Sequence, residues 1–192
     1  MTSANAEPSN LVAVIMGSDS DLPSLQPAIE ILEDFGIKVE TRILSAHRTP
    51  HKMMEFADEA ENKGLKVIIA GAGGAAHLPG MVASLTNIPV IGVPISTKTL
   101  KGIDSLYSIV QMPGGIPVAT VAINGGLNAG LLAAQILGTS IPSISSAVSK
   151  YRKKLRNEVL TKYQNLIAIG ASKYISEFLA FFNKKSSAQL IY

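Results

Sequence analysis

The fold is indicated first by residues 11–21, which read Leu11-Val12-Ala13-Val14-Ile15-Met16-Gly17-Ser18-Asp19-Ser20-Asp21. Consecutive apolar residues that end at a glycine are typical of a strand buried on both faces of a parallel sheet. After the polar loop, Leu25, Ile29 and Leu32 recur at helical spacing until Gly36 ends the helix. The segment therefore predicts a strand, a loop and a helix in succession.

This alternation of strand and helix occurs five times. Further strands are predicted at 38–44, 65–70, 89–94 and 118–123, and further helices at 51–62, 79–86, 105–110 and 127–137. The connections are too short for anything but right-handed parallel crossovers. We therefore predict an α/β fold with a five-stranded parallel sheet over residues 10–138. A flexible N-terminus of residues 1–9 precedes this core, and a C-terminal helical arm of residues 139–192 follows it.

Length and composition favour a single domain over residues 1–192. Hydrophobic residues make up 47% of the chain and charged residues 16%, so we expect part of the apolar surface to lie between subunits. The absence of cysteine excludes disulfides, thiolate metal sites and a cysteine nucleophile. No secretory signal or membrane-spanning stretch is recognisable, so we expect a cytoplasmic protein without membrane contact.

The C-terminal arm is basic, whereas the rest of the chain is mildly acidic. Residues 150–192 contain nine Lys/Arg and two Asp/Glu, a net charge of +7, which leaves −4 for residues 1–149. The charged part lacks interleaved aromatic residues, which favours a solvated face or a subunit contact over nucleic-acid binding. We expect the arm to contact a neighbouring subunit, because no strand remains for it to pair with. An interfacial membrane helix over residues 163–182 is the alternative.

Three loops follow the first three predicted strands and should meet at one sheet edge, where open α/β sheets bind ligands. They comprise residues 17–21, the turn Ser45-Ala46-His47-Arg48-Thr49-Pro50, and the glycine-rich residues 71–80. The first loop could bind a phosphate at a helix N-terminus or only cap that helix, and the spacing does not decide between them. In the second loop, Thr49 is the predicted N-cap and Pro50 the first helical residue.

A metal site is not expected. The chain contains only three histidines, His47, His51 and His77. His47 and His51 are four residues apart, but Pro50 lies between them and no HExxH pattern accompanies them. His51 lies on the polar side of the predicted second helix, so we expect it to face solvent.

Four segments give the chain its resemblance to a known family. They are GSDSD at 17–21, SAHRTP at 45–50, AGAGGAAHLPGM at 70–81 and DSLYSIVQMPGGIPVATVAI at 104–123. Together they resemble the N5-carboxyaminoimidazole ribonucleotide mutase family of purine biosynthesis, in its short class I form, over about residues 10–160. The resemblance implies a flavodoxin-like three-layer α/β/α subunit in a homo-octamer, with active sites where subunits meet. It also implies an isomerase that moves a carboxylate from N5 to carbon 4 of an aminoimidazole ribonucleotide, without ATP, metal or organic cofactor.

Carried over residue by residue, the resemblance makes His47 the catalytic proton carrier. Ser18, Ser45 and Arg48 would hold the 5′-phosphate, and Asp21 the ribose hydroxyls. The base and carboxylate would be lined by the backbone of Gly71, Gly73 and Gly74, together with His77 and Leu78. A guanidinium and two hydroxyls suit a phosphate, and an imidazole suits proton transfer near neutral pH. For His77, a structural role in orienting the glycine loop is an equally supported interpretation.

The chain departs from the family pattern in two places. The loop at Asn124-Gly125-Gly126-Leu127-Asn128 is shorter than expected and lacks a lysine, and the arm beyond residue 162 is longer. Two other functions stay open at this point. One is direct carboxylation of aminoimidazole ribonucleotide with carbon dioxide, as in class II relatives. The other is a non-catalytic flavodoxin-like module that binds a nucleotide or flavin.

Overall fold

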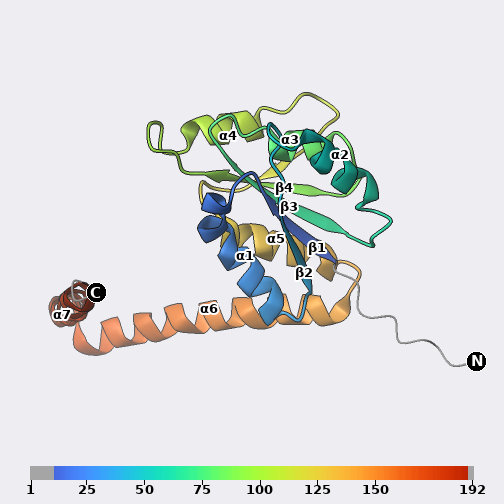
Figure 1. The fold of residues 1–192 in the computed structure, drawn as a ribbon. Coiled ribbons are helices and arrows are strands. Elements are labelled where there is room, and N and C mark those ends of the chain that lie inside the picture. The colour runs from blue at the N-terminus through green and yellow to red at the C-terminus, as the bar shows by residue number, and fades with distance from the viewer. Residues whose placement is uncertain (1–10, 190–192) are drawn as a thin grey trace, which may run out of the picture. The chain divides into compact units, whose positions relative to one another are not determined.

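The computed structural model describes residues 11–189, with side chains through Ala180; the predicted flexible N-terminus lies outside these residues. Its strands are β1 (Val12–Met16), β2 (Val39–Ile43), β3 (Val67–Gly73), β4 (Val90–Ile95) and β5 (Ala119–Thr120). They form one sheet in the order β2-β1-β3-β4-β5, and every neighbouring pair is parallel. The predicted five-stranded parallel sheet is thus confirmed (Figure 1).

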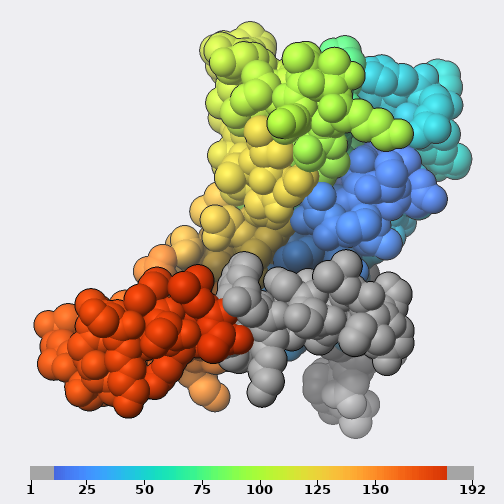
Figure 2. All heavy atoms as spheres, turned by 90° about the vertical axis from the view of Figure 1, so that its left-hand side faces the viewer, coloured from blue at the N-terminus to red at the C-terminus, as the bar shows by residue number. Residues whose placement is uncertain are grey.

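Helices cover both faces of the sheet, which confirms the three-layer α/β/α arrangement. The helices of this part of the chain are the short 3-10 turn η1 (Asp19–Asp21), α1 (Leu22–Asp34), α2 (Pro50–Glu59), α3 (Leu78–Ala83), α4 (Ile103–Val110) and α5 (Gly126–Gly138). Helices α1 and α5 lie side by side on one face, and α2, α3 and α4 lie on the other (Figures 1 and 2).

The alternation of side chains along β1 explains why its sequence is apolar without interruption. Val12, Val14 and Met16 belong to the apolar cluster beneath α1 and α5. Ala13 and Ile15 belong to the cluster on the opposite face, beneath α2 and α3. Successive strand residues point to opposite faces, so a strand covered on both sides needs apolar residues throughout.

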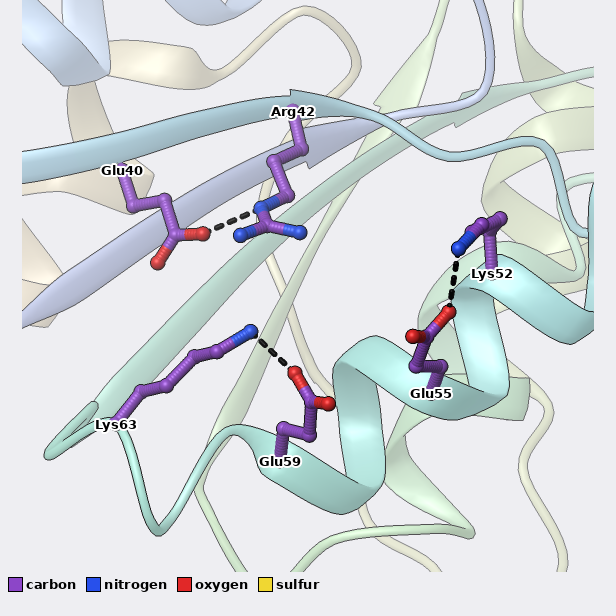
Figure 3. A network of polar contacts seen from close by, with 6 residues as sticks. All are labelled: Glu40, Arg42, Lys52, Glu55, Glu59 and Lys63. Atoms are coloured by element: carbon purple, nitrogen blue, oxygen red, sulfur yellow. Dashed lines mark hydrogen bonds and ion pairs between the residues drawn. The ribbon is translucent and has the colours of Figure 1, made fainter.

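Two ion pairs along α2 and the turn after it connect charged residues that face solvent (Figure 3). Lys52 Nζ lies 2.8 Å from Glu55, and Lys63 Nζ lies 2.5 Å from Glu59. Such exposed pairs each contribute at most about 1 kcal/mol to the free energy of unfolding. On β2, Arg42 pairs with Glu40 and also lies over the ring of a buried residue of α2, Phe56, 5.5 Å from its centroid.

The fifth strand is shorter than the six residues predicted at 118–123. Only Ala119 and Thr120 pair with β4 as a strand. The chain still runs beside β4, because the Val121 N–H donates to the Gly92 carbonyl over 3.0 Å. Pro117 precedes this segment without an N–H to donate, and Asn124 has a left-handed φ of 56° that turns the chain toward α5.

The described chain divides into two compact units, one up to Val148 and one from Ser149 onward. Helix α6 (Pro142–Ile169) ends at Gly170, whose φ is 76°, and α7 (Ala171–Gln189) follows. A glycine in this left-handed conformation is a common end of a helix. In the second unit, exposed large apolar side chains include Leu155, Val159, Leu160, Tyr163, Leu166, Ile167, Ile175, Phe178 and Leu179. Among residues 11–189, no helix is both long and apolar enough to cross a membrane.

Candidate functional site

A cavity of about 610 Å³ opens at the carboxyl edge of β1, β2, β3 and β4. Its walls come from four segments, residues 17–21, 45–48, 72–78 and 95–98. The sheet order places β1 between β2 and β3, so β2 is added on one side of β1 and all later strands on the other. Ligands of open α/β sheets bind at such a switch point. Three of these segments lie within the three predicted loops, and the fourth follows β4.

The first wall is a capped turn. The Ser18 hydroxyl accepts the Ser20 N–H over 3.4 Å, and the Asp21 carboxylate accepts the Ser18 N–H over 3.2 Å. These reciprocal bonds form a capping box. Ser18, Ser20 and Asp21 nevertheless line the cavity as well, so capping does not withdraw them from the site.

Asp21 is the one acidic residue among the described residues that line this cavity. Its side chain is buried, with 8% of the residue exposed. Burial raises the pKa of the Asp21 carboxyl above its ordinary value, and hydrogen bonds from Ser18, Ser20 and Gly17 partly oppose that rise. A carboxylate held in this way accepts hydrogen bonds from hydroxyl groups.

Ser45 orients the arginine of the second wall. Its hydroxyl accepts the Arg48 N–H over 3.2 Å and the Arg48 Nε–H over 3.3 Å. The Arg48 Nη2 donates to the Gly17 carbonyl over 3.0 Å, which joins the loops after β1 and β2. The guanidinium therefore has a fixed direction at the cavity wall.

Thr49 occupies the N-cap position of α2, as predicted, but its side chain makes no capping hydrogen bond. Its hydroxyl instead accepts the Ser45 N–H over 3.0 Å and donates to the Ser45 carbonyl over 3.1 Å. Two bonds to one residue close the turn at residues 45–49. Thr49 thus shapes the loop that carries His47 and Arg48.

Two histidines from different loops meet inside the cavity. His47 Nε2 lies 2.7 Å from His77 Nδ1, and the rings are nearly perpendicular at 88°. One facing nitrogen must donate and the other accept, so the two rings cannot both be imidazolium while this contact exists. His47 Nδ1 and His77 Nε2 remain as the outward nitrogens of the pair.

The glycine loop forms the third wall, and its glycines differ in position. Gly73 lines the cavity together with His77 and Leu78. Gly71 is buried within β3, where an added Cβ would lie 2.7 Å from a Leu25 methyl carbon. Gly74 has a φ of 68°, and its N–H donates to the buried Ser105 hydroxyl over 2.9 Å. Gly71 and Gly74 do not line the cavity, and their contact with a ligand stays a prediction.

The fourth wall, Ile95 to Lys98, was not predicted from the sequence. It follows β4, whose carboxyl end lies at the same edge as the other three. The signal was a polar run, Ser96-Thr97-Lys98-Thr99, directly after an apolar strand. Asn124 of the shortened loop supports this wall, because its side-chain oxygen accepts the Ser96 N–H over 2.9 Å.

His51 lies on α2, exposed and outside the cavity lining, as predicted. Within residues 11–189, no three His, Asp or Glu side chains gather where they could hold a metal ion. The cavity therefore offers hydroxyls, one guanidinium, one ammonium, one carboxylate and two imidazoles. Such groups suit an anionic, hydroxyl-bearing ligand and proton transfer.

Comparison with known proteins gives one consistent result. Residues 11–158 match the family model described as AIR carboxylase. The chain is 61% identical over 166 residues to the N5-carboxyaminoimidazole ribonucleotide mutase of Thermotoga maritima, covering 86% of this chain and 97% of that protein. It is 59% identical over 170 residues to the protein of the same name from Synechocystis, covering 88% and 97%. Among solved structures, Treponema denticola PurE is similar with a TM-score of 0.74 and 29% identity, covering 81% of this chain and 97% of that one.

Proposed function

The chain belongs to the AIR carboxylase family, and from that premise we propose that it is an isomerase of purine biosynthesis. Its substrate would be N5-carboxyaminoimidazole ribonucleotide and its product 4-carboxy-5-aminoimidazole ribonucleotide. The observation that carries this proposal is the His47–His77 pair beside Arg48 in a single cavity. The relatives from Thermotoga maritima and Synechocystis, each aligned with this chain over 97% of its length, are both named as mutases. Direct carboxylation and a non-catalytic binding module are therefore not favoured.

The phosphate end of the ligand would lie at Arg48, Ser18 and Ser45. Arg48 is already oriented by the Ser45 hydroxyl and the Gly17 carbonyl, which supports a role in binding a phosphate from a fixed direction. The Asp21 carboxylate, next to this end, would accept hydrogen bonds from the ribose hydroxyls. These assignments leave the histidine pair facing the base.

The reaction breaks the bond between N5 and the carboxyl carbon and forms a bond from that carbon to carbon 4. N5 gains a proton and carbon 4 loses one, so the conversion is balanced without a further reactant. His47, through its outward nitrogen, would donate the first proton and accept the second. A positioned acid or base of this kind contributes about 10²- to 10⁴-fold to the rate.

His77, Leu78 and the backbone of Gly71, Gly73 and Gly74 would surround the base and carboxylate. Confinement of the reacting groups in the cavity would further raise the rate, because well-oriented intramolecular reactions reach effective molarities of about 10⁵–10⁸ M. His77 would also fix the ring orientation and tautomer of His47 through their 2.7 Å contact. No step of this scheme requires a metal or an organic cofactor.

We also propose a homo-octamer in the cytoplasm. Exposed apolar residues support contacts between subunits: on and before α4, they are Leu100, Ile103, Tyr107 and Val110. Their spacing of three or four residues gives one continuous apolar stripe. Sedimentation of the full chain, compared with a chain ending at Lys162, would show whether the longer arm supports the assembly.

The proposed reaction is tested with purified protein and two substrates in parallel. Conversion of the N5-carboxylated compound to the 4-carboxylated product without ATP or added metal is the expected result. Product formation only from aminoimidazole ribonucleotide and bicarbonate would instead identify a carboxylase. Activity with neither substrate would leave a binding module.

A further inference from the structure

Lys98 is the second cationic side chain of the cavity after Arg48, and the proposed reaction gives it no role. It lies in the loop after β4 and lines the same cavity as Arg48. Arg48 already makes hydrogen bonds to Ser45 and Gly17, whereas no described residue forms a hydrogen bond or ion pair with the Lys98 side chain. Its ammonium group is therefore available to a ligand.

The loop that carries Lys98 is anchored on both of its sides. Before it, the Ser96 N–H donates to Asn124, and the Thr97 hydroxyl donates to Asp104 Oδ1 over 2.9 Å. After it, the Gly102 N–H donates to the Thr97 hydroxyl over 3.3 Å. These bonds hold the base of the loop while Lys98 itself is exposed. The backbone on both sides of Lys98 is thus held in place.

The sheet separates the two cations. Arg48 follows β2 and Lys98 follows β4, with β1 and β3 between them. Adjacent strands lie about 4.8 Å apart, so three spacings place the two loops about 14 Å apart before the side chains reach inward. His77, which follows β3, lies between them and contacts His47. His77 therefore follows a strand that lies between the strands that precede the two cations.

The substrate in the proposed function carries two anionic groups, a 5′-phosphate and a carboxylate on the base. Resting on that function, we propose that Lys98 binds the carboxylate while Arg48 binds the phosphate. The carboxylate is present in substrate and product alike, so an ion pair with Lys98 stabilises both.

The test is calorimetric binding of two ligands to the full chain. One is the 4-carboxylated product, and the other is aminoimidazole ribonucleotide, which has the phosphate but no carboxylate. For Lys98→Met we expect about tenfold weaker binding of the carboxylated ligand, the loss of one charge-assisted hydrogen bond, and unchanged binding of the other. Lys98→Arg keeps the charge and should keep most of the affinity.

Lys101→Met is the matched control, because it removes the same charge from the same loop at a residue outside the cavity lining. It should bind both ligands as the wild type does. Equal loss of both ligands in Lys98→Met, or no loss of either, would overturn the assignment of Lys98 to the carboxylate. If the wild type binds neither ligand, the proposed function fails first.

Discussion

Replacing His77 with phenylalanine removes the nitrogen that contacts His47 while retaining a ring of similar shape. The structure shows one contact to be lost, the 2.7 Å bond between His47 Nε2 and His77 Nδ1. A hydrogen bond of this kind contributes about 0.5–1.5 kcal/mol net, which corresponds to about 2- to 12-fold in rate. His77 is exposed and its side chain makes no capping bond to α3, so the free energy of unfolding should hardly change.

The assay is the steady-state conversion of N5-carboxyaminoimidazole ribonucleotide, with kcat and KM determined separately. For His77→Phe we expect kcat to fall within that 2- to 12-fold range, because His47 loses its orientation but keeps its proton-transfer nitrogen. His47→Asn should lose about 10²- to 10⁴-fold in kcat while still binding the ligand. The double variant should be about as slow as His47→Asn alone, because both changes act on one group.

A loss above about 100-fold in kcat for His77→Phe would refute this reasoning, since one orienting hydrogen bond cannot account for it. His77 would then itself be the proton carrier, above all if His47→Asn retained most of its activity. A rise in KM with unchanged kcat would instead show that His77 acts only by binding the substrate and does not orient His47. Urea unfolding of each variant shows whether a loss of activity reflects a loss of structure.

Three further predictions concern binding and stability. Arg48→Ala should raise KM by about 10- to 150-fold, because hydrogen bonds to charged groups contribute about 1.5–3 kcal/mol; unchanged kinetics would remove Arg48 from the phosphate site. Gly126→Ala should destabilise the protein by about 1–3 kcal/mol in urea unfolding, because the added Cβ would lie 2.0 Å from the Ser24 carbonyl oxygen, a backbone atom. Burial raises the folded-state pKa of Asp21, so its contribution to stability is complete below its unfolded pKa and lost as the pH rises through the folded pKa. The difference in unfolding free energy between Asp21→Asn and the wild type should therefore shift in favour of the variant as the pH rises from 4 to 7. An equal difference at both pH values would contradict this.

Local patterns in the sequence were sufficient for the layers of the fold. The uninterrupted apolar run of β1 reports burial on both faces, and the helical spacing of Leu25, Ile29 and Leu32 reports a helix with one apolar side. Both are properties of neighbouring residues, so they can be read without knowing the rest of the chain. The end of β5 was less predictable, because strand pairing there depends on Pro117 and on the turn at Asn124.

The sequence alone also placed the three loops of the site at one sheet edge, because parallel strands have a common direction. Only the tertiary structure brought His47 within 2.7 Å of His77, thirty residues later. That contact depends on the order β2-β1-β3, which arises from packing between distant segments. The same order added Lys98 after β4 as a fourth wall, whereas Gly71 was placed under Leu25 rather than in the cavity lining. Residue types indicated the chemistry, and long-range packing decided which of those residues meet.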